Sequence, residues 1–148
     1  MSTMFEDVKD FHRFFGHSIA RNPKFLTEER FSNRLKWQDE ERTEFIDAIN
    51  AKDITEAADA LVDQVYFILG TAVEMGIPFD HIWKLVHKAN MAKGYRESHF
   101  ATCPLNREHE VPVKCDCGAV KYKEDGKTAK PEGWKAPDSD IRRLLTRW

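Results

Sequence analysis

Several features that define other classes of protein are missing from this sequence. Its 148 residues contain no long apolar segment, so no membrane contact is expected. The start, MSTMFEDVKDFHRFF, lacks the basic residues and apolar core of a secretory signal, which favours a cytoplasmic location. No basic stripe of the kind that holds a nucleic-acid backbone is present, which argues against a nucleic-acid polymer as a partner.

The composition is that of one globular domain with an uneven distribution of charge. Hydrophobic residues make up 41% and charged residues 32%, and the length suits a single core. The net charge is only −2, but residues 37–63 hold nine acids and two bases. Residues 107–148 hold ten Lys or Arg and eight Asp or Glu. An acidic middle with a mildly basic tail suits a cation site combined with phosphate contacts.

Apolar residues recur at three- and four-residue intervals through most of the first 93 residues, which predicts an all-α fold. Start and stop signals predict four helices. They run from Phe5 past Ile19 to a break at Asn22-Pro23, from the N-cap Thr27 to about Asn50, from the cap Asp53 to Gly76, and from Pro78 to Gly94. Beyond Gly94, Pro, Gly and charged residues predict an irregular extension over residues 95–148 that packs on the helical domain of residues 1–94. Within it we expect strand-like alternation at VPVKCDCGAVKY, a turn at Asp125-Gly126 and a short helix after Asp138.

Two groups of acids stand on neighbouring predicted helices. At 100° per residue, three acids of the second helix fall within an arc of about 100° and three of the third within about 60°. They are Glu40, Glu41 and Glu44, followed by Glu56, Asp59 and Asp63. If the two helices pack antiparallel, both groups point into one space, where the like charges need a compensating cation.

A solvated charged face is the ordinary explanation for such acids, and Glu56 alone could serve as part of a helix cap. Two observations count against it. No Lys or Arg follows these acids at helical spacing, and Asp59 stands in a run of Ala, Leu and Val. Carboxylate clusters suit Mg²⁺ or Mn²⁺. A di-iron bundle would need Glu-x-x-His, which the sequence lacks.

The spacing EExxE followed by ExxD resembles the MazG-like all-α nucleoside triphosphate pyrophosphohydrolase superfamily, which includes the phosphoribosyl-ATP pyrophosphohydrolases. RLKWQDEERTEF resembles the metal helix of that family and EAADALVDQVYFILGTAVEMGI its second helix. The resemblance implies that the metal ligands are Glu41, Glu44, Glu56 and Asp59, with Glu40 binding metal or orienting the attacking water. Asp63 lies outside the motif.

The resemblance continues into segments that meet phosphates in the family. In KANMAKGY the matching residues are Asn90 and Lys93. EDGKTAKPEGWKAPD resembles an Asp-Gly-Lys…Lys-Pro stretch of small family members, which makes Lys127 and Lys130 weaker candidates. The alternative explanation, that both lysines are ordinary surface residues beside a hairpin turn, is the stronger one. Arg34, one helical turn before Trp37, is a further candidate.

The resemblance implies hydrolysis between the α and β phosphates of a nucleoside triphosphate, giving a monophosphate and pyrophosphate. Two or three Mg²⁺ (or Mn²⁺) ions would serve each site, with Glu40 and Glu41 as the catalytic residues. The family also implies a four-helix core completed in a homodimer or homotetramer. A deoxynucleotide is expected, with the purine nucleotide dGTP as the first choice and dUTP and dCTP as rivals. The aromatic residues Trp37, Phe15, Tyr66 and Trp83 could stack on the base, although core or interface packing explains each of them.

Three cysteines near the C-terminus form a second candidate metal site, which belongs to no part of the recognised motif. Tetrahedral Zn²⁺ favours thiolate and imidazole ligands, and Cys-x-Cys before Gly is a credible knuckle. The candidate ligands are Cys103, His109, Cys115 and Cys117, with His99 as a rival to His109. Three reduced thiols in an ordinary loop are the alternative.

Three other functions stay open on the sequence alone. One is an all-α dUTP/dUDP hydrolase, which would also turn over a diphosphate. Another is a helical module without catalysis that uses a zinc-bound tail as an interaction surface. The third is a phosphoribosyl-ATP enzyme, which the long tail and Asp63 disfavour.

Overall fold

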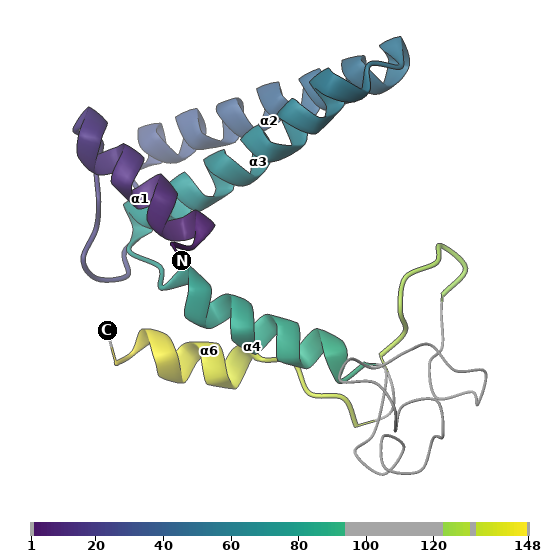
Figure 1. Cartoon of the computed structure of the whole chain (residues 1–148). Helices are drawn as coiled ribbons and strands as arrows, with labels where there is room; N and C mark the ends of the chain where they lie inside the picture. Colours follow the sequence, from purple (N-terminus) through teal and green to yellow (C-terminus); the bar gives the residue numbers. More distant parts are fainter. Residues whose placement is uncertain (1, 94–122, 131–132, 148) are drawn as a thin grey trace. The chain divides into compact units, whose positions relative to one another are not determined.

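The computed structural model describes residues 2–93, 123–130 and 133–147, and the regular elements in these ranges are all helices (Figure 1). The all-α prediction is therefore confirmed. In chain order the helices are α1 (Met4–Phe15), α2 (Glu28–Ala51), α3 (Ile54–Met75), α4 (Phe79–Met91) and α6 (Asp138–Leu145).

The chain divides into two compact units. The first comprises Met1–Asp80 with Leu145–Trp148, and the second comprises His81–Leu144. The domain boundary expected near residue 94 stays a prediction, because most of the extension lies outside the described residues.

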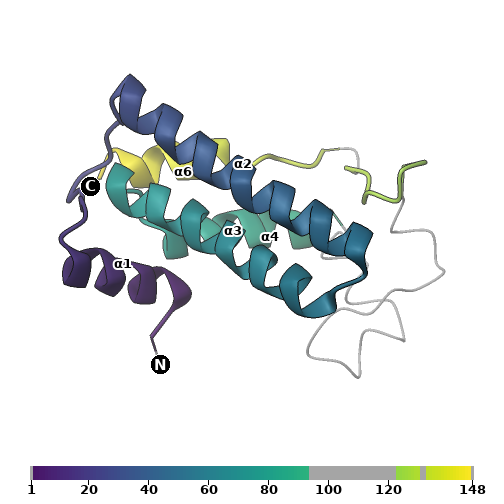
Figure 2. The ribbon, with the colours of Figure 1, turned by 90° about the horizontal axis from the view of Figure 1, so that it is seen from above.

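The long helices α2 and α3 form an antiparallel hairpin and lie side by side in both views (Figure 1 and Figure 2). Local sequence sets its ends. The Thr27 side chain accepts a hydrogen bond from the Arg30 amide, as the predicted N-cap requires. Asp53 caps α3 by accepting from the amides of Thr55 and Glu56. The two-residue link between the helices leaves the hairpin little freedom of register.

The small core of the first unit lies where α1 packs against the C-terminal half of α3. Its buried members are Phe5, Val8, Leu69, Ala72 and Val73. The Phe79 ring stacks on Phe5 at a centroid distance of 6.0 Å, and Asp80 accepts a hydrogen bond from the Thr3 hydroxyl. The beginning of α4 is thereby attached to α1.

The first helix ends earlier than the sequence predicted. Gly16 adopts a left-handed conformation with φ of 70°, and its amide donates to the carbonyl groups of His12 and Arg13. The helix therefore stops four residues before Ile19, whose side chain still packs on the core from the following loop. A C-terminal glycine cap explains this better than the more distant Asn22-Pro23.

In the second unit the predicted short helix after Asp138 is present as α6, and the turn at Asp125-Gly126 is also confirmed. There the Gly126 amide donates to the Lys123 carbonyl group at 3.0 Å. In the described part of the chain no single helix is long and apolar enough to cross a bilayer. Among the described helices, only α3 and α4 taken together, as a pair bent at the break between them, have the length and composition of a membrane span.

Large apolar side chains remain exposed along the hairpin of α2 and α3. They include Phe31, Leu35, Ile46, Ile49, Leu61, Val62, Val65 and Ile68. Apolar surface of this extent is typical of a protein interface. The expected oligomer stays a prediction that this surface favours.

Gly76, the C-cap of α3, allows a sharp test of packing. Its φ is 66°, and an added Cβ would lie 2.7 Å from the carbonyl carbon of Asn22. Gly16 has a similar φ of 70° but open space around the same position. We expect Gly16→Ala to lower the free energy of unfolding by about 1–2 kcal/mol through backbone strain. Gly76→Ala should cost about 1–3 kcal/mol more because of the clash. Urea denaturation would measure both, and equal losses would contradict this account of the contact with Asn22.

Candidate active site

The hairpin brings acids from both predicted groups together around Glu41. Burial raises the pKa of the Glu41 carboxyl group, and the negative charges of Glu44, Asp63, Glu40 and Asp59 raise it further, in that order. The first and third of these stand on α2 and the other two on α3. The two acidic groups therefore do share one electrostatic environment, and Asp63, which lies outside the motif, belongs to it.

The Glu41 carboxyl group also has an unusual hydrogen-bonding state. Its Oε2 atom is buried and has no hydrogen-bond partner in the protein. Leaving a buried polar atom without a partner costs about 1–3 kcal/mol, and more for a charged one. Such an atom in a native fold commonly indicates an ion, a water molecule or a functional role.

The remaining acids of the motif are more accessible. In the single chain Glu40, Glu44, Glu56 and Asp59 are exposed, while Asp63 is half-buried. The apolar neighbours of Asp59 in the sequence suggested a buried position, but the side chain is exposed because Ala57 and Ala60 occupy the buried side of α3. Among the residues described, no three acidic, histidine or cysteine side chains converge closely enough to hold a metal ion.

Glu40 has a partner that the sequence analysis overlooked. The Lys36 ammonium lies 3.6 Å from the Glu40 carboxylate, and both side chains are exposed. The expectation from the sequence concerned only basic residues that follow the acids, whereas Lys36 precedes Glu40 by one turn. An exposed pair of this kind contributes at most about 1 kcal/mol, so it leaves Glu40 available.

Glu56 is not needed for the cap that offered its ordinary explanation. In a complete capping box its side chain would accept from the Asp53 amide. That amide instead donates to the Ala48 carbonyl group at 2.9 Å. A role in the helix cap therefore does not explain why a glutamate stands at position 56.

Arg34, a predicted phosphate contact, lies buried in an ion-pair network. It is 4% exposed, and the Glu74 carboxylate that it faces is 1% exposed. The Arg34 Nη2 atom lies 2.7 Å from Glu74 Oε1, and Arg34 Nε donates to Oε2 at 3.2 Å. Arg30 donates to the same carboxylate through Nε, at 2.8 Å, and through Nη2. We call this set of three residues the Arg–Glu–Arg network.

Burial alone would raise the pKa of Glu74, but the hydrogen bonds from Arg30 and Arg34 outweigh it and lower the pKa to about 2. This network was not predicted from the sequence, although a signal was present. Arg30 and Arg34 stand four residues apart, and like charges at that spacing need a counter-charge just as the acids do.

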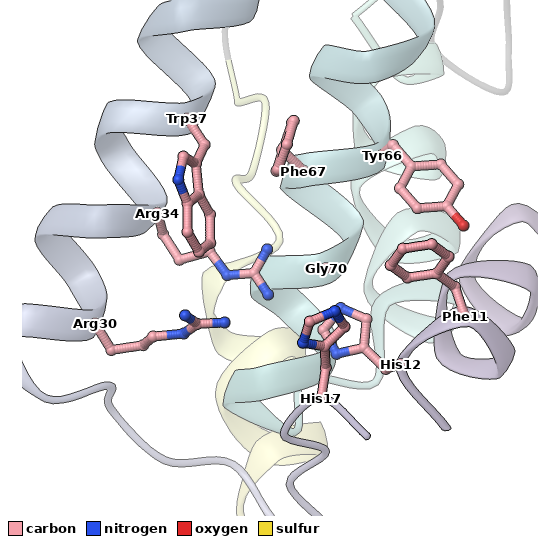
Figure 3. A pocket seen from close by; sticks show the side chains of 9 residues that line it. All are labelled: Phe11, His12, His17, Arg30, Arg34, Trp37, Tyr66, Phe67 and Gly70. Carbon is pink, nitrogen blue, oxygen red and sulfur yellow. The ribbon is translucent and has the colours of Figure 1, made fainter. Parts of the chain in front are cut away.

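Next to this network, a pocket of about 440 Å³ opens between α1, α2 and α3 (Figure 3). Aromatic and basic side chains from all three helices and the loop after α1 line it around Gly70. They are Phe11, His12, His17, Arg30, Arg34, Trp37, Tyr66 and Phe67. Two of the aromatic residues considered for base stacking, Trp37 and Tyr66, are among them.

In the second unit the structure gathers three of the four predicted phosphate contacts outside α2. Lys93 donates to the Asn90 side chain at 2.6 Å. The ammonium groups of Lys93 and Lys130 lie 5.4 and 4.6 Å from the centre of the Trp134 ring. Trp134, which the sequence analysis did not single out, donates from Nε1 to the Ala89 carbonyl group at 2.7 Å. Its indole ring therefore attaches the tail to the end of α4 and holds the two lysines near Asn90.

Two other sets of predicted residues receive less support. Lys127 lies 3.7 Å from the Asp125 carboxylate with both side chains exposed, as expected for a surface residue beside a turn. The candidate zinc ligands Cys103, His109, Cys115 and Cys117 lie outside the described residues, so the zinc site stays a prediction.

The low pKa of Glu74 leads to a prediction about stability. A carboxyl group with a lowered pKa stabilises the fold fully above its ordinary value of 4.5, and this contribution is lost as the pH falls toward 2. Glu74→Gln should lower the free energy of unfolding by about 3–5 kcal/mol at pH 7, because the buried Arg34 and the half-buried Arg30 lose their counter-charge. Urea denaturation at pH 3 to 7 should show the difference from the wild type narrowing as the pH falls.

Glu29→Gln is the matched control, because Glu29 is an exposed acid in the first turn of α2. It should change stability by less than about 1 kcal/mol. A difference between wild type and Glu74→Gln that stays constant from pH 7 to pH 3 would contradict the assignment.

Comparison with known proteins agrees with this arrangement. No curated protein matches the chain significantly. The protein-family model described as phosphoribosyl-ATP pyrophosphohydrolase matches residues 8–90. The match covers more than half of the chain, including α2, α3 and both groups of acids. The chain therefore belongs to the phosphoribosyl-ATP pyrophosphohydrolase family of the MazG-like all-α superfamily and is a nucleotide pyrophosphohydrolase of that type.

Proposed function

We propose that this protein is a Mg²⁺-dependent enzyme that hydrolyses a nucleoside triphosphate between its α and β phosphates. The products are a nucleoside monophosphate and pyrophosphate, and a deoxynucleotide, with dGTP as the first choice, is the proposed substrate. The observation that carries the proposal is the Glu41 carboxyl group, which is buried on one oxygen without a partner and faces four other acids.

The donor set fits Mg²⁺ or Mn²⁺ in its chemistry. Hard divalent cations prefer carboxylate oxygen atoms and keep several waters, so acids that are partly open to solvent suit them. Glu41, Glu44, Glu56 and Asp59 would hold the ions, with Asp63 nearby. When bound, Mg²⁺ would lower the pKa of a coordinated water and offset charge on the phosphates.

The residues of the chain would divide the remaining tasks. Glu40 stands beside Glu41 but is exposed and only weakly held by Lys36, so it can accept a proton or orient the attacking water. Lys93, Asn90 and Lys130 of the second unit stay the proposed phosphate contacts, because ammonium groups and a side-chain amide can supply positive charge and hydrogen-bond donors. Positive groups stabilise the charge that develops on the leaving pyrophosphate.

A homodimer or homotetramer is part of the proposal. The acids Glu44, Glu56 and Asp59 are exposed in the single chain, and apolar side chains of α2 and α3 remain uncovered beside them. A second hairpin packed on this surface would complete four helices and enclose the acids. This accounts for the fact that the described residues of one chain do not close into a full ligand set.

Phosphoribosyl-ATP is the second candidate substrate, because the matching family model carries that description. It contains the same α–β phosphate linkage, so the acids would act in the same way. The two candidates differ in the base, in the 2′-hydroxyl group and in the phosphoribosyl group that phosphoribosyl-ATP carries on its base, none of which the acids that bind the metal need to recognise.

A substrate panel tests the reaction. The purified protein would be incubated with each canonical dNTP and NTP, dUTP, dUDP and phosphoribosyl-ATP, in Mg²⁺ or Mn²⁺, and products separated by ion exchange. We expect monophosphate and pyrophosphate from one or two triphosphates, loss of turnover in EDTA, and no turnover of dUDP. Turnover of dUDP would favour a dUTP/dUDP hydrolase, and no turnover of any compound by folded protein would overturn the proposal.

Glu41→Gln should separate activity from stability. Turnover should fall by about 10²–10⁴-fold, because the variant loses a metal ligand and catalytic carboxylate. In EDTA the variant should be at least as stable as the wild type, since it removes a buried charge that faces four acids. Mg²⁺ should raise the melting temperature of the wild type and not of the variant.

Asp39→Asn is the control for this variant. Asp39 is an exposed acid of the same helix that lies 3.5 Å from Arg42, outside the motif. It should keep both the turnover and the Mg²⁺ response. A Glu41→Gln variant that is clearly less stable than wild type in EDTA would show that Glu41 has a structural role instead.

A further inference from the structure

The pocket between α1, α2 and α3 is built differently from the acidic site. Two of its walls consist of flat rings. On one side the rings of Trp37 and Phe67 lie 5.9 Å apart, and on the other the ring of His17 stacks on Phe11 at 5.8 Å. Phe11 is 38% exposed and Trp37 is half-buried, so both rings keep an accessible part at the pocket (Figure 3). The guanidinium carbons of Arg30 and Arg34 lie 4.9 and 5.3 Å from the centre of the Trp37 ring, so a base that stacks on Trp37 would also contact these cations.

The floor of the pocket is formed by a residue without a side chain. A Cβ placed on Gly70 would lie 2.8 Å from Arg34 Nη1 and 3.1 Å from His12 Nε2. These two nitrogen atoms therefore lie close together over the α3 backbone, in the space that a side chain at position 70 would take. Arg34 Nη1 takes no part in the bonds to Glu74, so it remains a donor toward the pocket.

The hydrogen-bonding role of His12 follows from its partner. Its Nδ1 atom lies 2.9 Å from the Ser18 carbonyl oxygen, which can only accept, so Nδ1 carries the proton. Burial lowers the pKa of His12 below its ordinary value of 6.5 and outweighs the hydrogen bond with Ser18, which raises it, so the ring is neutral at physiological pH. Nε2 must then be an acceptor. The floor of the pocket thus offers a donor and an acceptor next to each other.

The position of the pocket relates it to the acids. Trp37 precedes Glu41 by one turn of α2, and Phe67 follows Asp63 by one turn of α3, which is about 6 Å along each axis. The walls of the pocket therefore continue directly into the acidic site within the same helix hairpin. The Arg–Glu–Arg network gives the pocket side of the hairpin a net positive charge, while the charged residues in the next turn of each helix are acids.

We propose that this pocket binds the base of the nucleotide, with Trp37 stacking on its face and with Arg34 Nη1 and His12 Nε2 pairing with its edge. The inference rests on the proposed function, because it takes the acids as the place of the phosphates. Each nucleobase presents a hydrogen-bond acceptor beside an N–H donor, which is the complement of the pocket floor, but at ring positions that differ from base to base, so the floor can distinguish among them. His12 then acts as a specificity-determining residue that accepts from the N–H group of the base.

The test compares ligands with and without a base. Calorimetry with Mg²⁺ would measure binding of the α,β-methylene analogues of dGTP, dATP, dCTP and dTTP, which resist hydrolysis at that linkage, and of inorganic tripolyphosphate. At least one analogue should bind roughly tenfold more tightly than tripolyphosphate, the gain expected from stacking on one aromatic ring. Trp37→Leu should remove this excess and leave tripolyphosphate binding unchanged.

A second variant tests the pairing with the edge of the base, and a third serves as a control outside the pocket. His12→Phe keeps a ring but removes the acceptor, so it should narrow the differences among the four analogues. Phe14→Leu, at a ring that is 83% exposed on α1 and outside the pocket, should change nothing. Thermal unfolding of each variant would confirm that it is folded.

The outcomes separate this inference from the proposed function. If no analogue binds more tightly than tripolyphosphate, the assignment of the base pocket is wrong. It is also wrong if Trp37→Leu and His12→Phe both keep the wild-type ratios of analogue affinity to tripolyphosphate affinity. Either conclusion holds even where Mg²⁺ and tripolyphosphate bind well. If tripolyphosphate fails to bind with Mg²⁺ while an analogue binds through Trp37, the pocket stands and the acidic site is wrong.

Discussion

The buried carboxylate of Glu74 is the interaction on which the rest of the first unit depends. It holds Arg30 and Arg34 of α2 against the last turns of α3, and its own charge is maintained only because both guanidinium groups donate to it. A fully buried charge without such partners would cost several kcal/mol. The network therefore specifies which turn of α2 lies beside which turn of α3.

That register has consequences along the whole hairpin. Once Arg34 lies beside Glu74, the antiparallel arrangement places Gln38 beside Thr71, with a hydrogen bond of 3.3 Å, and Trp37 beside Phe67. One turn further it places Glu41 near Asp63 and Asp59. Charge is thus separated along the helix pair, with a compensated basic network at one end and uncompensated acids toward the other. The hairpin is stabilised by the compensated network at one end and is left with uncompensated acids where the metal ions are proposed to bind.

Local signals in the sequence predicted most of the fold, and long-range pairing explains the failures. Thr27, Asp53 and Gly76 marked helix ends correctly, because caps depend on neighbouring residues. The acids could be assigned to helix faces by spacing alone. The Arg–Glu–Arg network could not be assigned in this way, because Glu74 lies forty residues beyond Arg34. The burial of His12 likewise depends on long-range packing, because His12 stands on α1 and lies beside Arg34 of α2 and Gly70 of α3. The role of Trp134 depends on a tail whose sequence lacks the spacing of apolar residues that predicts a helix.

The loop between α1 and α2 has a property that follows from how it meets α3. The amides of Ala20 and Lys24 donate to the carbonyl groups of Val73 and Met75, at 3.1 and 2.9 Å, so this irregular segment completes the last turn of α3. The final carbonyl groups of a helix otherwise lack partners within the helix. The loop and the helix end must consequently open together, and amide exchange at Ala20 and Lys24 would report the local unfolding of α3 rather than the motion of a surface loop.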